Sequence, residues 1–145
     1  MEIIRKQSFK IVGIQVTSVW DYLFAEIPHT WQIFKDSYHG ISDKIDNRFM
    51  DICIKKDGNV FTQLIGVQVN DFGKIPESMI GLEIPESDYL YFKHRGKYSG
   101  INESFAKIYR WAKENSLNTD NFKIDYGYCI KEAEPIEHNL YVRIL

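Results

Sequence analysis

Asp125 is a candidate ligand-binding carboxylate, because it interrupts a segment that otherwise has strand character. Residues 122–130 read FKIDYGYCI, and Asp125 is the only acidic residue among them. Aspartate is disfavoured inside strands. A carboxylate surrounded by aromatic rings loses hydration, which raises its pKa unless a cation or a hydrogen-bond donor compensates. A ligand cation would compensate, and the faces of nearby rings would add about 0.5–2 kcal/mol of attraction.

The same residue also has a purely structural interpretation. Lys123 lies two positions before Asp125, and residues at that spacing share one face of a strand. The two side chains would then form an ion pair in solvent. The sequence leaves both interpretations open.

Aromatic residues make up 14% of the chain, with 9 Tyr, 9 Phe and 3 Trp. Tyrosine and tryptophan combine an apolar body with a polar edge, which suits the wall of a half-wet cleft. We therefore expect a ligand groove in which Asp125 is joined by the residues Tyr89, Tyr91, Tyr109, Trp111, Tyr126 and Tyr128.

Trp31 is a further candidate for the groove. Its spacing from Ile27 and Phe34 is more typical of a helix packed against a sheet, as is the spacing of Phe105 and Ile108 in a later segment.

Strand alternation puts Tyr91 and Phe92 on opposite faces, so only one of them can line the groove, and we favour Tyr91.

The composition argues against several classes of protein. The chain has 145 residues and a formal net charge of -2, with no basic stripe of the kind that binds nucleic acid directly. No segment resembles a secretory leader or a membrane span, so we expect a cytoplasmic protein with no membrane contact. The two cysteines, Cys53 and Cys129, lie in apolar segments and are expected to be reduced core residues.

No motif for a cofactor or a metal is present, and we expect neither. The four histidines are isolated in the sequence, without the spacing of metal ligands. There is also no phosphate-binding glycine loop and no nucleophile motif.

Hydrophobic periodicity predicts one α+β domain covering residues 1–145. A helix is expected to start at Ile27-Pro28 and to stop at Gly40, and a β-hairpin is expected to turn at Asp57-Gly58. The remaining predicted elements are a strand over 7–17, a strand over 79–96 broken at Pro85, a helix over 101–115, and strands over 122–130 and 140–145.

This order repeats the unit strand, helix, strand, strand. We expect two pseudo-twofold units that form one curved antiparallel sheet, with both helices on one face. A binding cleft would lie at the seam between the units or on the opposite face, because ligand sites favour internal interfaces.

The chain resembles the GyrI-like, or AraC-type, effector-binding domains that bind small molecules. The segments that carry the resemblance are KIVGIQV (10–16), WQIF (31–34), FTQLIGVQV (61–69), GLEIPESDYLYFKHRG (81–96), IYRWAKEN (108–115) and LYVRI (140–144). The pattern of a strand, a glycine turn and a helix is formed here by Ile84, Pro85, Tyr89, Phe92, Gly96, Tyr109 and Trp111.

The resemblance implies a central groove that binds amphipathic, often cationic or aromatic, small molecules. Many members of the family are fused to a DNA-binding unit, and we expect this chain to be like the stand-alone members. The family carries an acidic residue, most often glutamate, on the strand after the second helix. Asp125 is the acid on the matching strand here.

We expect sensing or sequestration of a small molecule rather than turnover. Two alternatives stay open. Some GyrI-like proteins are hydrolases of electrophilic molecules, and Asp125 could then act as a general base with Glu83 or Glu103. The chain could instead inhibit a protein partner such as a topoisomerase, if the acidic residues Glu132, Glu134 and Glu137 mimic DNA phosphates. Such a loop is more often simply solvated.

Overall fold

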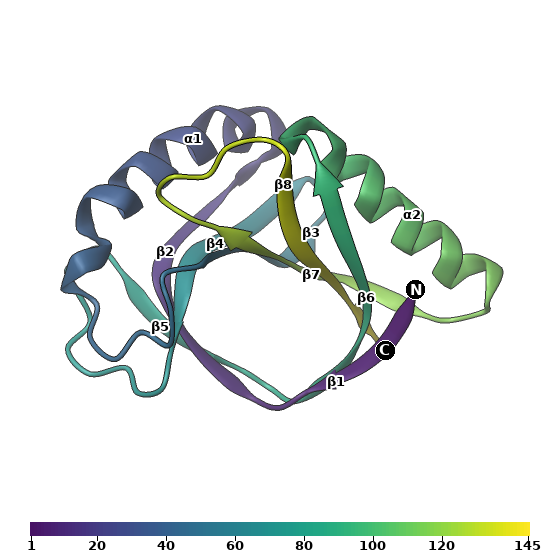
Figure 1. Cartoon of the computed structure of the whole chain (residues 1–145), viewed down its shortest axis with the longest axis horizontal. Helices are drawn as coiled ribbons and strands as arrows, with labels where there is room; N and C mark the ends of the chain where they lie inside the picture. Colours follow the sequence, from purple (N-terminus) through teal and green to yellow (C-terminus); the bar gives the residue numbers. More distant parts are fainter.

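The computed structural model describes residues 1–145 and contains a single antiparallel sheet of eight strands in the order β1-β6-β8-β7-β3-β4-β2-β5. The strands are β1 (Glu2–Lys6), β2 (Phe9–Val19), β3 (Phe49–Asp57), β4 (Val60–Val69), β5 (Ile80–Ile84), β6 (Ser87–Gly96), β7 (Thr119–Tyr128) and β8 (Ile136–Ile144). The helices are α1 (Trp20–Ser37) and α2 (Ile101–Glu114), with short 3-10 turns η1 (Tyr38–Gly40) and η2 (Tyr98–Gly100). The sheet curves strongly, and both helices lie on its outer side (Figure 1). The predicted α+β class is confirmed.

The sheet order shows how the two predicted units meet. The units β2-α1-β3-β4 and β6-α2-β7-β8 join through their central strands, because β3 pairs with β7. Each unit also sends one strand to the other. β1 precedes β2 in the chain but pairs with β6, and β5 precedes β6 but pairs with β2. Periodicity over 79–96 predicted one broken strand, whereas these residues form two strands on different parts of the sheet.

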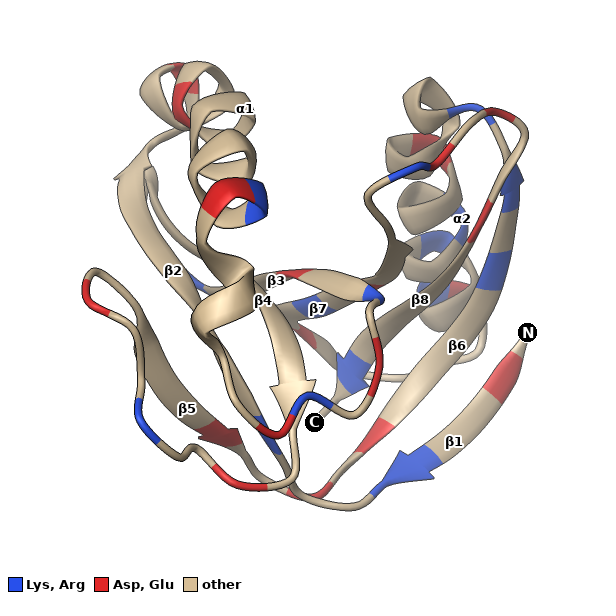
Figure 2. Ribbon diagram, turned by 60° about the vertical axis from the view of Figure 1, so that its left-hand side comes forward, with Lys and Arg blue, Asp and Glu red and all other residues tan.

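Three apolar clusters hold the sheet and the helices together. Phe34 of α1 packs with Phe49, Ile65 and Val67 on one half of the helix side of the sheet. On the other half, α2 packs through Phe105 and Ile108. The third cluster contains no helix residue and fills the inner side of the curve; it includes Ile11, Ile52, Leu64, Tyr89 and Ile124. Because α1 packs on β2 and β4, and α2 on β6 and β8, the central strands β3 and β7 lie between the helices (Figure 2).

The first helix begins earlier than the sequence predicted. It starts at Trp20, and Pro28 lies inside it rather than in its first turn. Leu23 explains the earlier start, since its side chain is buried and anchors the first turns before the proline is reached. Neither helix combines the length and apolar character needed to cross a membrane.

Two glycines allow β2 and β4 to approach closely. Gly13 and Gly66 face each other across this pair of strands. A Cβ atom on Gly13 would lie 2.1 Å from the carbonyl oxygen of Ile65, and one on Gly66 would lie 2.6 Å from that of Val12. Neither neighbour can yield without moving the backbone.

We therefore predict that Gly13→Ala lowers the free energy of unfolding by about 1–3 kcal/mol, because the added methyl forces the two strands apart. Chemical denaturation of the variant measures the change. Gln15→Ala, at an exposed position of the same strand, should stay within about 0.5 kcal/mol of the parent protein. Equal effects of the two changes would contradict the close approach.

Candidate functional site

Two aspartates face each other at the centre of the sheet. Asp51 of β3 is paired with Asp125 of β7, at the seam between the two units. Their neighbours Ile52 and Ile124 point into the cluster on the inner side of the sheet, so strand alternation puts both aspartates on the helix side. Directly opposed residues of an antiparallel pair have Cβ atoms about 4.5–5.5 Å apart. The strip between the helices therefore carries a pair of carboxylates.

Asp125 is fully engaged by neighbouring side chains. It is only 5% exposed. Its Oδ1 lies 2.7 Å from Nδ1 of His138, and its Oδ2 accepts a hydrogen bond of 2.6 Å from the Tyr128 hydroxyl. The alternative in which Asp125 faces solvent beside Lys123 is therefore wrong.

A β-bulge brings Tyr128 onto the same face as Asp125. In a regular strand, residues three positions apart point to opposite faces. Here the register between β3 and β7 shifts, so that Met50 pairs with Tyr126 while Phe49 pairs with Tyr128. Gly127 has a φ of +147°, which L side chains rarely adopt. The bulge turns the Tyr128 ring toward Asp125 and the helices.

A chain of hydrogen bonds continues from Asp125 toward the start of α2. Nε2 of His138 lies 2.8 Å from Oε2 of Glu132, and the hydroxyl of Tyr98 donates to the other oxygen of Glu132. Burial lowers the pKa of His138, but the hydrogen bonds to Asp125 and Glu132 outweigh burial and raise that pKa above its ordinary value. An imidazole held between two carboxylates is stabilised in its charged form, with a proton on each nitrogen.

The loop that carries Glu132, Glu134 and Glu137 is thus partly structural. Glu132 belongs to this buried network and is not a solvated charge, whereas Glu137 pairs at the surface with Lys93 and Arg95. This separation leaves no continuous row of free carboxylates along the loop.

Asp51 has fewer hydrogen-bond partners than Asp125. Its Oδ1 accepts a hydrogen bond of 2.9 Å from Nε2 of Gln63. Burial, and then the charge of Asp125, raise the pKa of Asp51 to about 7, while Lys123 and Gln63 act in the opposite direction. Asp51 therefore changes its charge near neutral pH, directly opposite Asp125.

Aromatic rings close one end of the strip. Trp31 of α1 lies 4.6 Å from Tyr128 between ring centroids, and Tyr128 is stacked with Tyr98 at 6.2 Å. The ring of Tyr128 also packs against the imidazole of His138, with 4.4 Å between the ring centroids. The row of rings runs from the first helix to the turn before the second helix, above the acidic network.

The structure brings together three of the eight residues that the sequence suggested for the groove. These are Asp125, Tyr128 and Trp31. Three others lie on the opposite face of the sheet: Tyr126 and Tyr89 join the inner cluster, and Tyr91 contacts Tyr141 there. That face is filled by apolar side chains, so the strip with the two aspartates lies at the predicted seam but on the helix side.

The remaining two residues belong to α2. The ammonium of Lys123 lies 5.8 Å from the centre of the Tyr109 ring. Burial raises the pKa of the Tyr109 hydroxyl to about 12. Trp111 packs against the cluster beneath α2. Neither residue contacts Asp125.

Sequence reasoning missed four members of the network, which are Asp51, His138, Glu132 and Tyr98. Asp51 carried the signal used for Asp125, because it is an acid between the strand residues Met50 and Ile52. The other three could not be found that way, since their roles depend on contacts between distant elements.

The fold, in which two strand-helix-strand-strand units share one curved sheet, is that of the GyrI-like effector-binding domains. The sequence model for integron-associated effector binding proteins matches residues 2–144, and the chain belongs to that family. The predicted resemblance is thereby confirmed.

Individual relatives agree with this assignment. The chain is 27% identical over 113 residues to the transcriptional regulator BrlR of Pseudomonas aeruginosa, covering 74% of this chain but only 39% of BrlR. The structure of SAV2435 bound to tetraphenylphosphonium superimposes with a TM-score of 0.78 at 14% identity, over 99% of this chain and 93% of that one. An integron cassette protein from the mobile metagenome of Vibrio cholerae gives a TM-score of 0.71 at 10% identity, over 99% and 95% of the two chains.

The raised pKa of Asp51 predicts a pH-dependent stability. A raised pKa means that the folded state holds the proton more tightly than the unfolded state, so this stabilisation is present below about pH 4 and lost as the pH rises through 7. We expect Asp51→Asn to gain about 1–2 kcal/mol relative to the parent protein between pH 4 and pH 8, after allowance for solvent screening. Denaturation midpoints at both pH values measure the gain. Parallel pH profiles of the two proteins would contradict the raised pKa.

Proposed function

We propose that the protein binds an amphipathic, cationic aromatic molecule in the strip between α1 and α2, to sense or to sequester it. The observation that carries this proposal is the pair of aspartates at the β3–β7 seam, directly below aromatic side chains from both halves. The direct partner in this proposal is a small molecule and not a nucleic acid.

The charge of the strip favours a cation. Asp51, Asp125 and Glu132 contribute up to three negative charges, which face the ammonium of Lys123 and the imidazole of His138, whose charged form is favoured by its hydrogen bonds. An additional positive charge would balance the site once Asp51 is ionised. A carboxylate in a partly buried position interacts with a cation more strongly than a solvated one does, because less water screens the pair.

Asp51 is the better direct partner for the ligand charge. Both oxygens of Asp125 already accept hydrogen bonds, from His138 and Tyr128. Asp51 has one such bond, from Gln63, and its other oxygen has no protein donor. We assign Asp125 the role of a second, indirect charge that also holds Tyr128 in place.

Trp31 and Tyr128 are suited to hold the apolar part of the ligand. Their rings are tilted by 41° and are both partly exposed, so each can present a face to a flat or bulky aromatic group. A cation next to such faces gains about 0.5–2 kcal/mol from each favourable contact.

The relatives support the same class of ligand. Tetraphenylphosphonium, which is present in the SAV2435 structure, is a lipophilic aromatic cation. BrlR is a transcriptional regulator of which this chain spans about two fifths. A sensing role would match a regulator of that kind, whereas sequestration would need no further domain.

We predict that tetraphenylphosphonium quenches tryptophan fluorescence saturably at pH 8, because the Trp31 ring contacts Tyr128, the hydrogen-bond partner of Asp125. Asp51→Asn should weaken binding about tenfold, and Asp125→Asn should weaken it by a similar or smaller factor. Glu103→Gln is the matched control, since it removes one negative charge from an exposed position on α2 and should change affinity less than twofold. Absence of saturable quenching, or equal loss in all three variants, would overturn the proposal.

The affinity for tetraphenylphosphonium should also rise with pH. Only the ionised form of Asp51 attracts the cation, and its pKa of about 7 places the change near neutrality. We expect affinity to increase about fivefold to tenfold between pH 6 and pH 8, and the increase to be much smaller in Asp51→Asn. A titration series at constant ionic strength measures the difference, and an unchanged pH profile in the variant would exclude Asp51 as the charge partner.

A further inference from the structure

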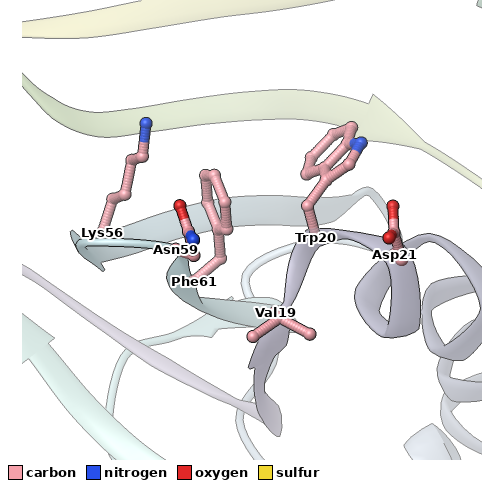
Figure 3. Close-up of a pocket in the computed structure, with 6 residues that line it drawn as sticks. All are labelled: Val19, Trp20, Asp21, Lys56, Asn59 and Phe61. Carbon is pink, nitrogen blue, oxygen red and sulfur yellow. The ribbon is translucent and has the colours of Figure 1, made fainter.

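A cavity outside the strip of the two aspartates lies where α1 begins, beside the turn of the β3–β4 hairpin. It has a volume of about 340 Å³ and is lined by Val19, Trp20, Asp21, Lys56, Asn59 and Phe61. Figure 3 shows the rings of Trp20 and Phe61 side by side, with Lys56 at one end of the row and Asp21 at the other. None of these residues belongs to the acidic network.

The cavity is far from the aspartate pair. Asp51 and Lys56 are both on β3, and the five residue steps from one to the other correspond to about 16 Å at 3.3 Å per residue. The helix gives a similar separation, since the step from Trp20 to Trp31 along α1 spans about 16 Å at 1.5 Å per residue. The cavity and the aspartate pair are therefore separate places on the molecule.

The aromatic walls of the cavity are open. The side chain of Trp20 is 51% exposed even though it lies only 5.4 Å from the ring of Phe61, with the two planes tilted by 56°. Tilted rings leave faces free, on which a flat aromatic molecule can stack. Exposed tryptophan beside a cavity has an apolar surface that a ligand can remove from water.

Lys56 supplies a positive charge without a partner. Its ammonium lies 5.3 Å from the centre of the Phe61 ring and forms no ion pair, whereas the adjacent Lys55 is paired with Asp57 at 3.5 Å. A cation above an aromatic wall is arranged to meet an anionic group on a stacked ligand. Asp21, at the other end, would repel such a group and so fixes its direction.

We propose that this cavity binds a planar aromatic carboxylate, stacked on Trp20 and Phe61 with its carboxylate directed to Lys56 and away from Asp21. The charge preference is thus the reverse of that proposed for the aspartate pair. This proposal does not depend on cation binding at the aspartate pair, so either of the two binding proposals can fail without the other.

The test compares 2-naphthoate with its neutral analogue 2-naphthamide by isothermal titration calorimetry at pH 8. We expect 2-naphthoate to bind at least about fivefold more tightly than 2-naphthamide. Lys56→Met should remove that preference, and Lys55→Met should keep it. Asp21→Asn should tighten 2-naphthoate about twofold, because a repelling charge is lost.

Two further variants distinguish this cavity from the strip of the two aspartates. Trp20→Leu should weaken both naphthalene compounds at least about fivefold, and Asp51→Asn should change neither by more than about twofold. Circular dichroism checks that each variant is folded. Equal affinity for the two compounds, or equal losses in Lys56→Met and Lys55→Met, would overturn the proposal, as would undiminished binding in Trp20→Leu.

Discussion

The pairing of β3 with β7 is the interaction on which the candidate site depends. This pairing joins the two halves of the chain and, in the same register, sets Asp51 opposite Asp125. Two carboxylates so close together repel each other, and the cost is reduced in different ways at the two positions. Asp125 has the imidazole of His138 and the phenol of Tyr128 as hydrogen-bond partners, whereas Asp51 holds its proton until about neutral pH. The seam of the fold therefore sets two acidic side chains opposite each other, on a part of the sheet that neither helix covers.

The positions of the helices follow from the topology of each unit. A helix that connects the outer strand of a unit to its central strand packs on the outer two strands, β2 and β4 for α1 and β6 and β8 for α2. The helix side of the central strands then has to be covered by side chains alone. Trp31, Tyr128 and Tyr98 do so at one end, and Trp20 and Phe61 lie at the other. Polar residues occur between them because this part of the surface is not fully buried.

The sequence predicted the class, the repeat and part of the site, because those depend on local patterns. Alternation and turn residues located the hairpin at Asp57-Gly58, and the interruption of a strand by Asp125 indicated an unusual carboxylate. The misplaced start of α1 has a local cause, since proline is a weak marker when a buried Leu23 precedes it. The side on which each tyrosine lies was harder to predict. A single bulge at Gly127 moves Tyr128 to the helix side while Tyr126 stays on the inner side. Regular strand alternation would put both tyrosines on the same face, so it could not predict this difference. His138 and Glu132 were beyond reach because their partners come from other strands.

The exchange of outer strands limits how the molecule can respond to a ligand. β1 of the first half is held by β6 of the second, and β5 of the second half is held by β2 of the first. Opening at the seam would have to break the hydrogen bonds of both of these strand pairs as well as those between β3 and β7. Wholesale opening of the two halves is thus a costly motion, and rotation of the partly exposed Trp31 ring is a less costly one. Because all three pairings tie the halves together, changes of shape at the seam are confined to side chains while the sheet stays intact.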